Sequence, residues 1–209
     1  MMLFFVACEN EKVEDSLFNY EWDNIENHLI SQINWNLDDY LAYLNPSTDR
    51  DIITLKEIKK GNYTNINSNE LFITFHVDAV HSAGLDRTIA VIYNANSLEL
   101  ITQKTFVADT VYLHILPSES THILFIGDVT YQGLSTYKAN LFELYGNQWV
   151  EKTIDESFES TENLYYSFTN GNILHVFTLN YDEKFHPTFI YEDELIWHNN
   201  TFEKRTKIN

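Results

Sequence analysis

Apolar positions along the chain follow two different periods. From residue 17 to about residue 50 they recur three or four residues apart, which is the spacing of an amphipathic helix. From about residue 55 onward they alternate with polar positions in segments of strand length. The pattern therefore predicts a helical lead over residues 17–50, followed by a β domain over residues 51–209.

Two helices are expected in the lead. One apolar stripe predicts an amphipathic helix from Leu17 to Asn34. A second, short helix is expected after an N-cap at Asn36, with apolar side chains up to Leu44, and Pro46 stops it. We expect both helices to pack as a cap on the β domain. The stripe of the first helix consists of Leu17, Trp22, Ile25, Leu29 and Ile33.

A threefold repeat organises the β domain. Three apolar segments, Leu71–Val77, Ile123–Val129 and Ile173–Leu179, recur about every fifty residues in similar strand-turn-strand settings. We predict a mainly β fold of three four-stranded antiparallel meanders, spanning about 55–107, 110–155 and 163–208. The expected strands are 55–63, 71–78, 88–93 and 98–106; 111–116, 122–130, 140–145 and 148–154; and 163–168, 172–180, 194–198 and 201–208.

Turns and loops complete each unit. Asn170 and Gly171 predict a type I′ hairpin turn. Longer loops, 79–87, 131–139 and 181–193, join the second and third strands of the units. In a blade-like arrangement these loops share one end, where binding surfaces commonly form. They carry aromatic side chains that can stack on sugars or enter a protein interface, with loop anchoring as the alternative role: Tyr131, Tyr137, Tyr181, Phe185 and Tyr191.

Four-stranded meanders of this period resemble β-propeller blades. The segment Gly61–Leu71 is similar to the opening of FG-GAP-type propeller repeats, in which an acidic loop often binds calcium. Here Asn65, Asn67 and Asn69 replace the carboxylates, so the resemblance implies the turn but not the metal. Three blades do not close a ring. We therefore expect a partial propeller covered by the helical lead, two packed sheets or a large barrel, or two chains that complete one ring.

Composition limits the partners. With 31 acidic and 13 basic residues, the net charge is −18, which repels nucleic acid and anionic lipid surfaces. A basic protein is a fitting partner, and plain solubility is the alternative reason for the charge. The contents of 44% hydrophobic and 15% aromatic residues argue against a disordered chain. A folded acidic domain is expected.

The first eight residues, MMLFFVAC, end in the one cysteine of the chain, so no internal disulfide can form. Phe5, Val6 and Ala7 before Cys8 resemble the lipobox of bacterial lipoprotein signal peptides. The resemblance implies lipidation (palmitate) of Cys8, loss of residues 1–7 and an acidic tether up to residue 16. It also implies a bacterial cell-envelope location, at the outer membrane, periplasm or cell surface, with the lipid as the only membrane contact. An ordinary N-terminal segment with a buried cysteine is the alternative.

Catalytic and cofactor motifs are absent from the sequence. There is no Gly-x-Ser-x-Gly, no Gly-x-Gly-x-x-Gly and no Walker loop. We predict no catalytic residue and no cofactor. The nearest approach to a metal site is His76, Asp78 and His81, but no fourth ligand is indicated and Asp128 and Thr178 replace His76 in the other units. No resident metal is predicted.

These observations favour a non-enzymatic cell-envelope lipoprotein that binds a protein or a glycan through its inter-strand loops. Two other classes stay open. One is an acidic inhibitor or immunity protein that occludes a basic enzyme, and the other is a glycan hydrolase that uses paired carboxylates of an acidic rim.

Overall fold

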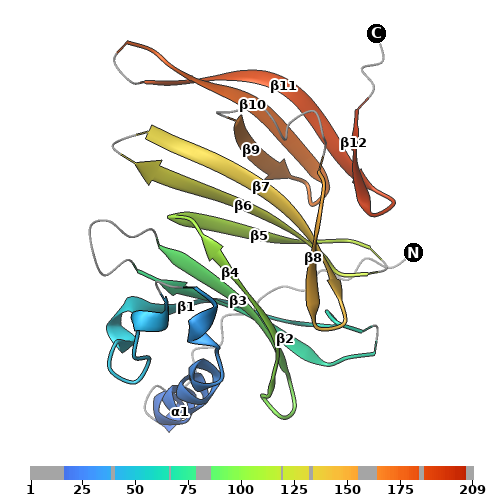
Figure 1. The fold of residues 1–209 in the computed structure, drawn as a ribbon. Coiled ribbons are helices and arrows are strands. Elements are labelled where there is room, and N and C mark those ends of the chain that lie inside the picture. The colour runs from blue at the N-terminus through green and yellow to red at the C-terminus, as the bar shows by residue number, and fades with distance from the viewer. Residues whose placement is uncertain are drawn as a thin grey trace.

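The computed structural model describes residues 17–38, 41–65, 67–78, 86–118, 120–131, 134–154, 164–183 and 186–205. These residues form a helical lead and twelve strands in three separate four-stranded antiparallel sheets (Figure 1). The predicted mainly β fold of three meanders with an N-terminal helical lead is confirmed. Each sheet follows chain order, so the described strands form neither two larger sheets nor one continuous sheet.

The strands have the following bounds. The first sheet contains β1 (Ile53–Gly61), β2 (Glu70–Val77), β3 (Arg87–Asn94) and β4 (Leu100–Val107). The second contains β5 (Thr110–Leu116), β6 (His122–Tyr131), β7 (Leu134–Tyr145) and β8 (Gln148–Lys152). The third contains β9 (Leu164–Thr169), β10 (Ile173–Tyr181), β11 (Pro187–His198) and β12 (Thr201–Lys204).

The lead differs from its prediction after the first helix. Helix α1 (Leu17–Ser31) ends three residues before Asn34, where the predicted helix was to end. The predicted second helix is wrong in the residues of its segment that the structure describes. They form two single 3-10 turns, η1 (Trp35–Leu37) and η2 (Leu41–Tyr43), and a third, η3 (Arg50–Ile52), precedes β1. The Asn34 side chain accepts a hydrogen bond from the Asn36 N–H at 3.1 Å and caps the start of η1, and the extended backbone of Asp38 ends that turn. No helix in the described part of the chain combines the length and apolarity that a membrane span needs.

The lead covers one face of the first sheet (Figure 1). Leu29, Ile33 and Leu41 pack with Phe75 and Val91 in one buried cluster. The opposite face of the same sheet packs against the second sheet, so β2 and β3 are buried on both faces. This explains why both strands read as nearly continuous apolar runs.

Two further clusters join the sheets. Phe106 of the first sheet stacks on Phe125 of the second, with ring centroids 4.6 Å apart. Leu124 and Leu141 on the other face of the second sheet pack with Leu174 of the third. The order of layers is therefore lead, first sheet, second sheet and third sheet, as Figure 1 shows.

Two predicted loops are largely strand. β7 begins at Leu134 and β11 at Pro187, well before the predicted starts at residues 140 and 194, so β6–β7 and β10–β11 are long hairpins (Figure 1). Thr136 and Lys138 are exposed while Tyr137 and Ala139 are half-buried, which is the alternation of a strand. The apolar pattern of the sequence does not show this strand, because its first residues are mostly polar. Asn170 (φ 54°) and Gly171 (φ 72°) have the left-handed conformations that the predicted type I′ turn requires.

Candidate functional site

The predicted binding aromatics lie on or beside the two long hairpins. Tyr137 is on β7 and Tyr191 is on β11, so both belong to strands rather than loops. Tyr181 ends β10 and Tyr131 ends β6. Phe185 lies outside the described residues.

A set of aromatic rings, here called the aromatic cluster, joins the second and third sheets. The Tyr165 ring of β9 lies 4.8 Å from the Tyr137 ring, 4.8 Å from the Phe189 ring and 5.8 Å from the Phe177 ring, between centroids. Phe177 in turn lies 5.4 Å from Tyr191. The structure therefore brings Tyr137 and Tyr191 into one cluster. Its members are Tyr137, Tyr165, His175, Phe177, Phe189 and Tyr191.

Strand register creates this cluster. β9 pairs Tyr165 with Phe177, and β11 pairs Tyr191 with the same Phe177. A β-bulge after Val176 skips Glu192, because Val176 pairs with Asp193 and Phe177 pairs with Tyr191. Without the extra residue, Tyr191 would point to the opposite face of the sheet. The bulge thus aligns three aromatic side chains across three strands.

Charged groups border the cluster. The Arg205 guanidinium lies 2.8 Å from the Glu194 carboxylate, and Lys204 lies 3.3 Å from Asp193. The hydrogen bond from Arg205 holds the pKa of Glu194 below its usual range, against the opposing effect of desolvation. Burial, followed by the negative charge of Glu194, raises the pKa of Tyr191, so its hydroxyl stays protonated at neutral pH.

His175 connects the rings to this border. Its Nε2 lies 2.9 Å from the Thr169 hydroxyl and its Nδ1 lies 3.5 Å from the Glu194 carboxylate. The His175 ring centroid is 6.3 Å from that of Tyr191. The imidazole is therefore held between polar partners at the edge of the cluster.

A cavity of about 350 Å³ opens beside the cluster, between β5 and β9. Tyr137 and Tyr165 are members of the cluster that also line the cavity, and Asp128 adds a carboxylate to the lining. Burial, with a smaller effect from the Lys59 charge, lowers the pKa of His114, so this lining imidazole is neutral at pH 7. The cavity combines aromatic walls with a carboxylate, a combination that suits a cationic side chain.

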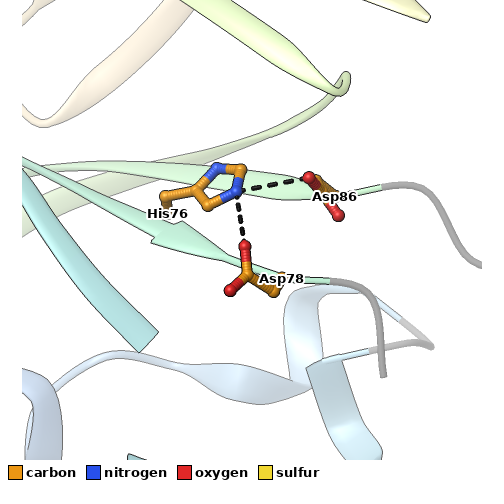
Figure 2. A group of neighbouring side chains, drawn as sticks. All are labelled: His76, Asp78 and Asp86. Atoms are coloured by element: carbon orange, nitrogen blue, oxygen red, sulfur yellow. Dashed lines mark ion pairs between the residues drawn. The ribbon is translucent and has the colours of Figure 1, made fainter. Parts of the chain in front are cut away.

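The structure describes two of the three metal-site candidates, His76 and Asp78. His76 of β2 and Asp78, directly after it, lie together, with the Nε2 atom 2.9 Å from Asp78 Oδ1 (Figure 2). His81 lies outside the described residues. Sequence reasoning missed Asp86, whose Oδ2 lies 3.3 Å from the same His76 Nε2. The signal for Asp86 was in the hairpin register: because Val77 pairs with Arg87, the residues that flank the hairpin loop face one another.

Comparisons with known proteins find no match for this chain among family models, curated proteins or solved structures.

Proposed function

We propose that this chain is a non-enzymatic binding protein that holds a protein partner on its aromatic cluster and takes a basic side chain of that partner into the adjacent cavity. One observation carries the proposal. Tyr137 and Tyr165 belong to the aromatic cluster and also line the cavity to which Asp128 contributes a carboxylate. Aromatic anchors beside a pocket are the usual energetic centre of a protein interface.

The arrangement of the rings favours a protein over a glycan. Interplanar angles within the cluster run from 37° between His175 and Phe177 to 86° between Tyr137 and Tyr165. Rings tilted in this way present edges and ridges instead of the flat platform on which a sugar ring stacks. Phe189 and Tyr191, which share one face of β11, are 47% and 42% exposed, so apolar area is available for a partner to cover.

Charge supports a basic partner. The net charge of −18 accelerates the approach of a positively charged protein and selects against acidic ones. If the partner is a basic enzyme and this surface occludes it, the chain acts as an inhibitor or immunity protein. That function is a special case of the same proposal.

Binding is testable with defined probes. We would titrate the protein with short lysine- and arginine-containing peptides that carry an apolar neighbour, observed by NMR, and screen a glycan array in parallel. Tyr137→Ala and Asp128→Asn should each weaken peptide binding about ten-fold, corresponding to about 1.4 kcal/mol. Tyr43→Ala removes an 88% exposed tyrosine from the lead and should leave the affinity unchanged.

Two results would contradict the proposal. In the first, the peptides bind but Tyr137→Ala and Asp128→Asn bind as well as the parent protein. In the second, peptides fail across the panel while a glycan binds and protects the cluster resonances. The second result would move the function to carbohydrate recognition.

The cellular part of the proposal concerns the N-terminus. We place the protein in the bacterial envelope, anchored by a lipid on Cys8, because Phe5, Val6 and Ala7 before that cysteine resemble a lipobox. Cys8→Ser should transfer the protein from the membrane fraction to the soluble fraction in a bacterial host. Unchanged partitioning of the variant would refute the anchor without bearing on the binding surface.

A further inference from the structure

Two carboxylates converge on one imidazole nitrogen at the end of the β2–β3 hairpin (Figure 2). The three potential ligand atoms, one each from His76, Asp78 and Asp86, all lie within 4.8 Å of one another. Two anionic groups at this separation repel each other, so the arrangement favours a cation between them.

One N–H on the imidazole cannot make good hydrogen bonds to both carboxylates. The Nε2–H of a neutral histidine forms one well-directed hydrogen bond, whereas both Asp78 Oδ1, at 2.9 Å, and Asp86 Oδ2, at 3.3 Å, approach the same nitrogen. Ligands with bonds of about 2.0 Å to a tetrahedral Zn²⁺ lie about 3.3 Å apart. The separations around Nε2 are close to that value, so a metal ion fits with small movements of the side chains.

The backbone holds both carboxylate residues in place. The Asp78 N–H donates to the Ile52 carbonyl oxygen at 2.9 Å, and the Asp86 carbonyl oxygen accepts from the Ala108 N–H at 3.2 Å. His76 is fixed on β2, opposite Thr88 of β3. Ligands that are fixed before the ion arrives lose less conformational freedom on binding.

Access also favours an ion. The side chain of Asp78 is 56% exposed, and His76 lines a cavity of about 560 Å³ between β1 and β5. Lys56, Glu57 and Asp109 line the same cavity, and Glu57 is in an ion pair with Lys59 at 2.8 Å. Arg87, next to Asp86 in the chain, has its Nε 3.1 Å from the Asp38 carboxylate. A hydrated cation can therefore reach the site from solvent at Asp78 and through this cavity, which both acidic and basic side chains line.

We propose that His76, Asp78 and Asp86 bind one divalent transition-metal ion of the Zn²⁺ class, with the remaining coordination positions open to solvent and the cavity. The imidazole ligand selects Zn²⁺, Co²⁺ or Ni²⁺ over Ca²⁺ and Mg²⁺, which prefer oxygen ligands throughout. The site is independent of the aromatic cluster.

Calorimetric titration of the full chain with ZnCl₂ tests the site, together with the visible absorption of bound Co²⁺. We expect one equivalent of Zn²⁺ that excess Ca²⁺ does not displace. Asp86→Asn keeps the shape of the side chain and should weaken binding about ten-fold or more, and His76→Gln should abolish the Co²⁺ spectrum of the site. Circular dichroism of each variant verifies that it is folded.

The matched control is His186→Gln. It removes another histidine-aspartate pair, in which His186 Nδ1 lies 3.1 Å from Asp182 Oδ2 with no second carboxylate recorded beside it among the described residues. This variant should keep the full stoichiometry and affinity. The proposal is overturned if the parent protein binds no Zn²⁺ saturably, or if His76→Gln and Asp86→Asn bind as tightly as His186→Gln.

Discussion

Trp197 of β11 donates its indole N–H to the backbone carbonyl oxygen of Pro117 at 2.9 Å, across the boundary between the third and second sheets. Trp197 is 5% exposed, and its indole ring packs beside Phe202, with ring centroids 5.1 Å apart. One side chain thus contributes both a hydrogen bond and apolar packing where the two sheets meet. The third sheet carries most of the aromatic cluster, so its attachment positions the candidate binding surface.

Trp197→Phe tests this attachment. The change removes the indole N–H and part of the buried ring, while Pro117 is exposed enough for water to replace the donor. We expect a loss of about 1–2 kcal/mol in the free energy of unfolding. Urea denaturation measures it. A loss as small as that of an exposed change such as Tyr145→Phe would show that the indole does not stabilise the boundary.

Glu70 makes a pH-dependent contribution to stability. Its carboxylate accepts hydrogen bonds from the Tyr63 N–H at 2.7 Å, from the Thr64 N–H at 2.9 Å and from the Thr64 hydroxyl. Burial acts to raise the pKa of Glu70, but these hydrogen bonds together hold it below the usual value of 4.5. Glu70→Gln should destabilise the protein by about 1–3 kcal/mol at pH 7, because charged acceptors make the stronger bonds.

The sign of the pH effect follows from the lowered pKa. A carboxyl group with a lower pKa in the folded state stabilises the fold fully above its unfolded pKa, and that contribution is lost as the pH falls through the folded value. The stability difference between the parent and Glu70→Gln should therefore shrink below about pH 4. Exposed Glu203→Gln is the control. A difference that is constant from pH 7 to pH 3 would contradict this account.

Gly127 allows the first two sheets to approach closely. A Cβ atom at this position would overlap the Phe125 ring and lie 2.9 Å from the Cβ of Ala108. Gly127→Ala should cost about 1–3 kcal/mol of unfolding free energy, because the Phe125 ring that stacks on Phe106 would be displaced. In a double-mutant cycle, Phe125→Leu should relieve part of that cost. Strict additivity of the two changes would show that the predicted overlap does not occur.

Hydrophobic alternation located most strands within two or three residues, because each sheet has at least one buried face. It failed for the first halves of β7 and β11, for different reasons. The first half of β7 carries polar residues such as Thr136 and Lys138, and in β11 Phe189, Ile190 and Tyr191 are consecutive exposed apolar residues that show no alternation. Strand pairing continues there through backbone hydrogen bonds, which leave no trace in the apolar pattern. In the second predicted helix, the predicted N-cap Asn36 lies inside η1, whose N-cap is Asn34, and the extended backbone of Asp38 ends that turn.

The candidate sites were only half visible in the sequence. Residue type identified Tyr137 and Tyr191, but Tyr165 and Phe177 read as ordinary strand residues. The pairing of Tyr191 with Phe177 depends on the bulge after Val176, and a one-residue change of register has no sequence signature of its own here. The pairing of β2 with β3 likewise brings Asp86 to His76, which requires the hairpin register rather than a motif.

The Tyr93 hydroxyl links the helical lead to the first sheet. The fully buried Tyr93 donates to the Leu29 carbonyl oxygen at 2.8 Å, near the end of α1, and burial raises the pKa of its hydroxyl so that it stays a donor at alkaline pH. Tyr93→Phe removes only this donor. The Leu29 oxygen also accepts from the Gln32 N–H, so we expect a modest loss of about 0.5–1.5 kcal/mol in the free energy of unfolding. Relative to the parent protein, amide hydrogen exchange should become faster in α1 by more than it does in β6. Tyr112→Phe, at a 59% exposed position, is the control, and equal exchange rates of α1 in the two variants would show that the lead is held by apolar packing alone.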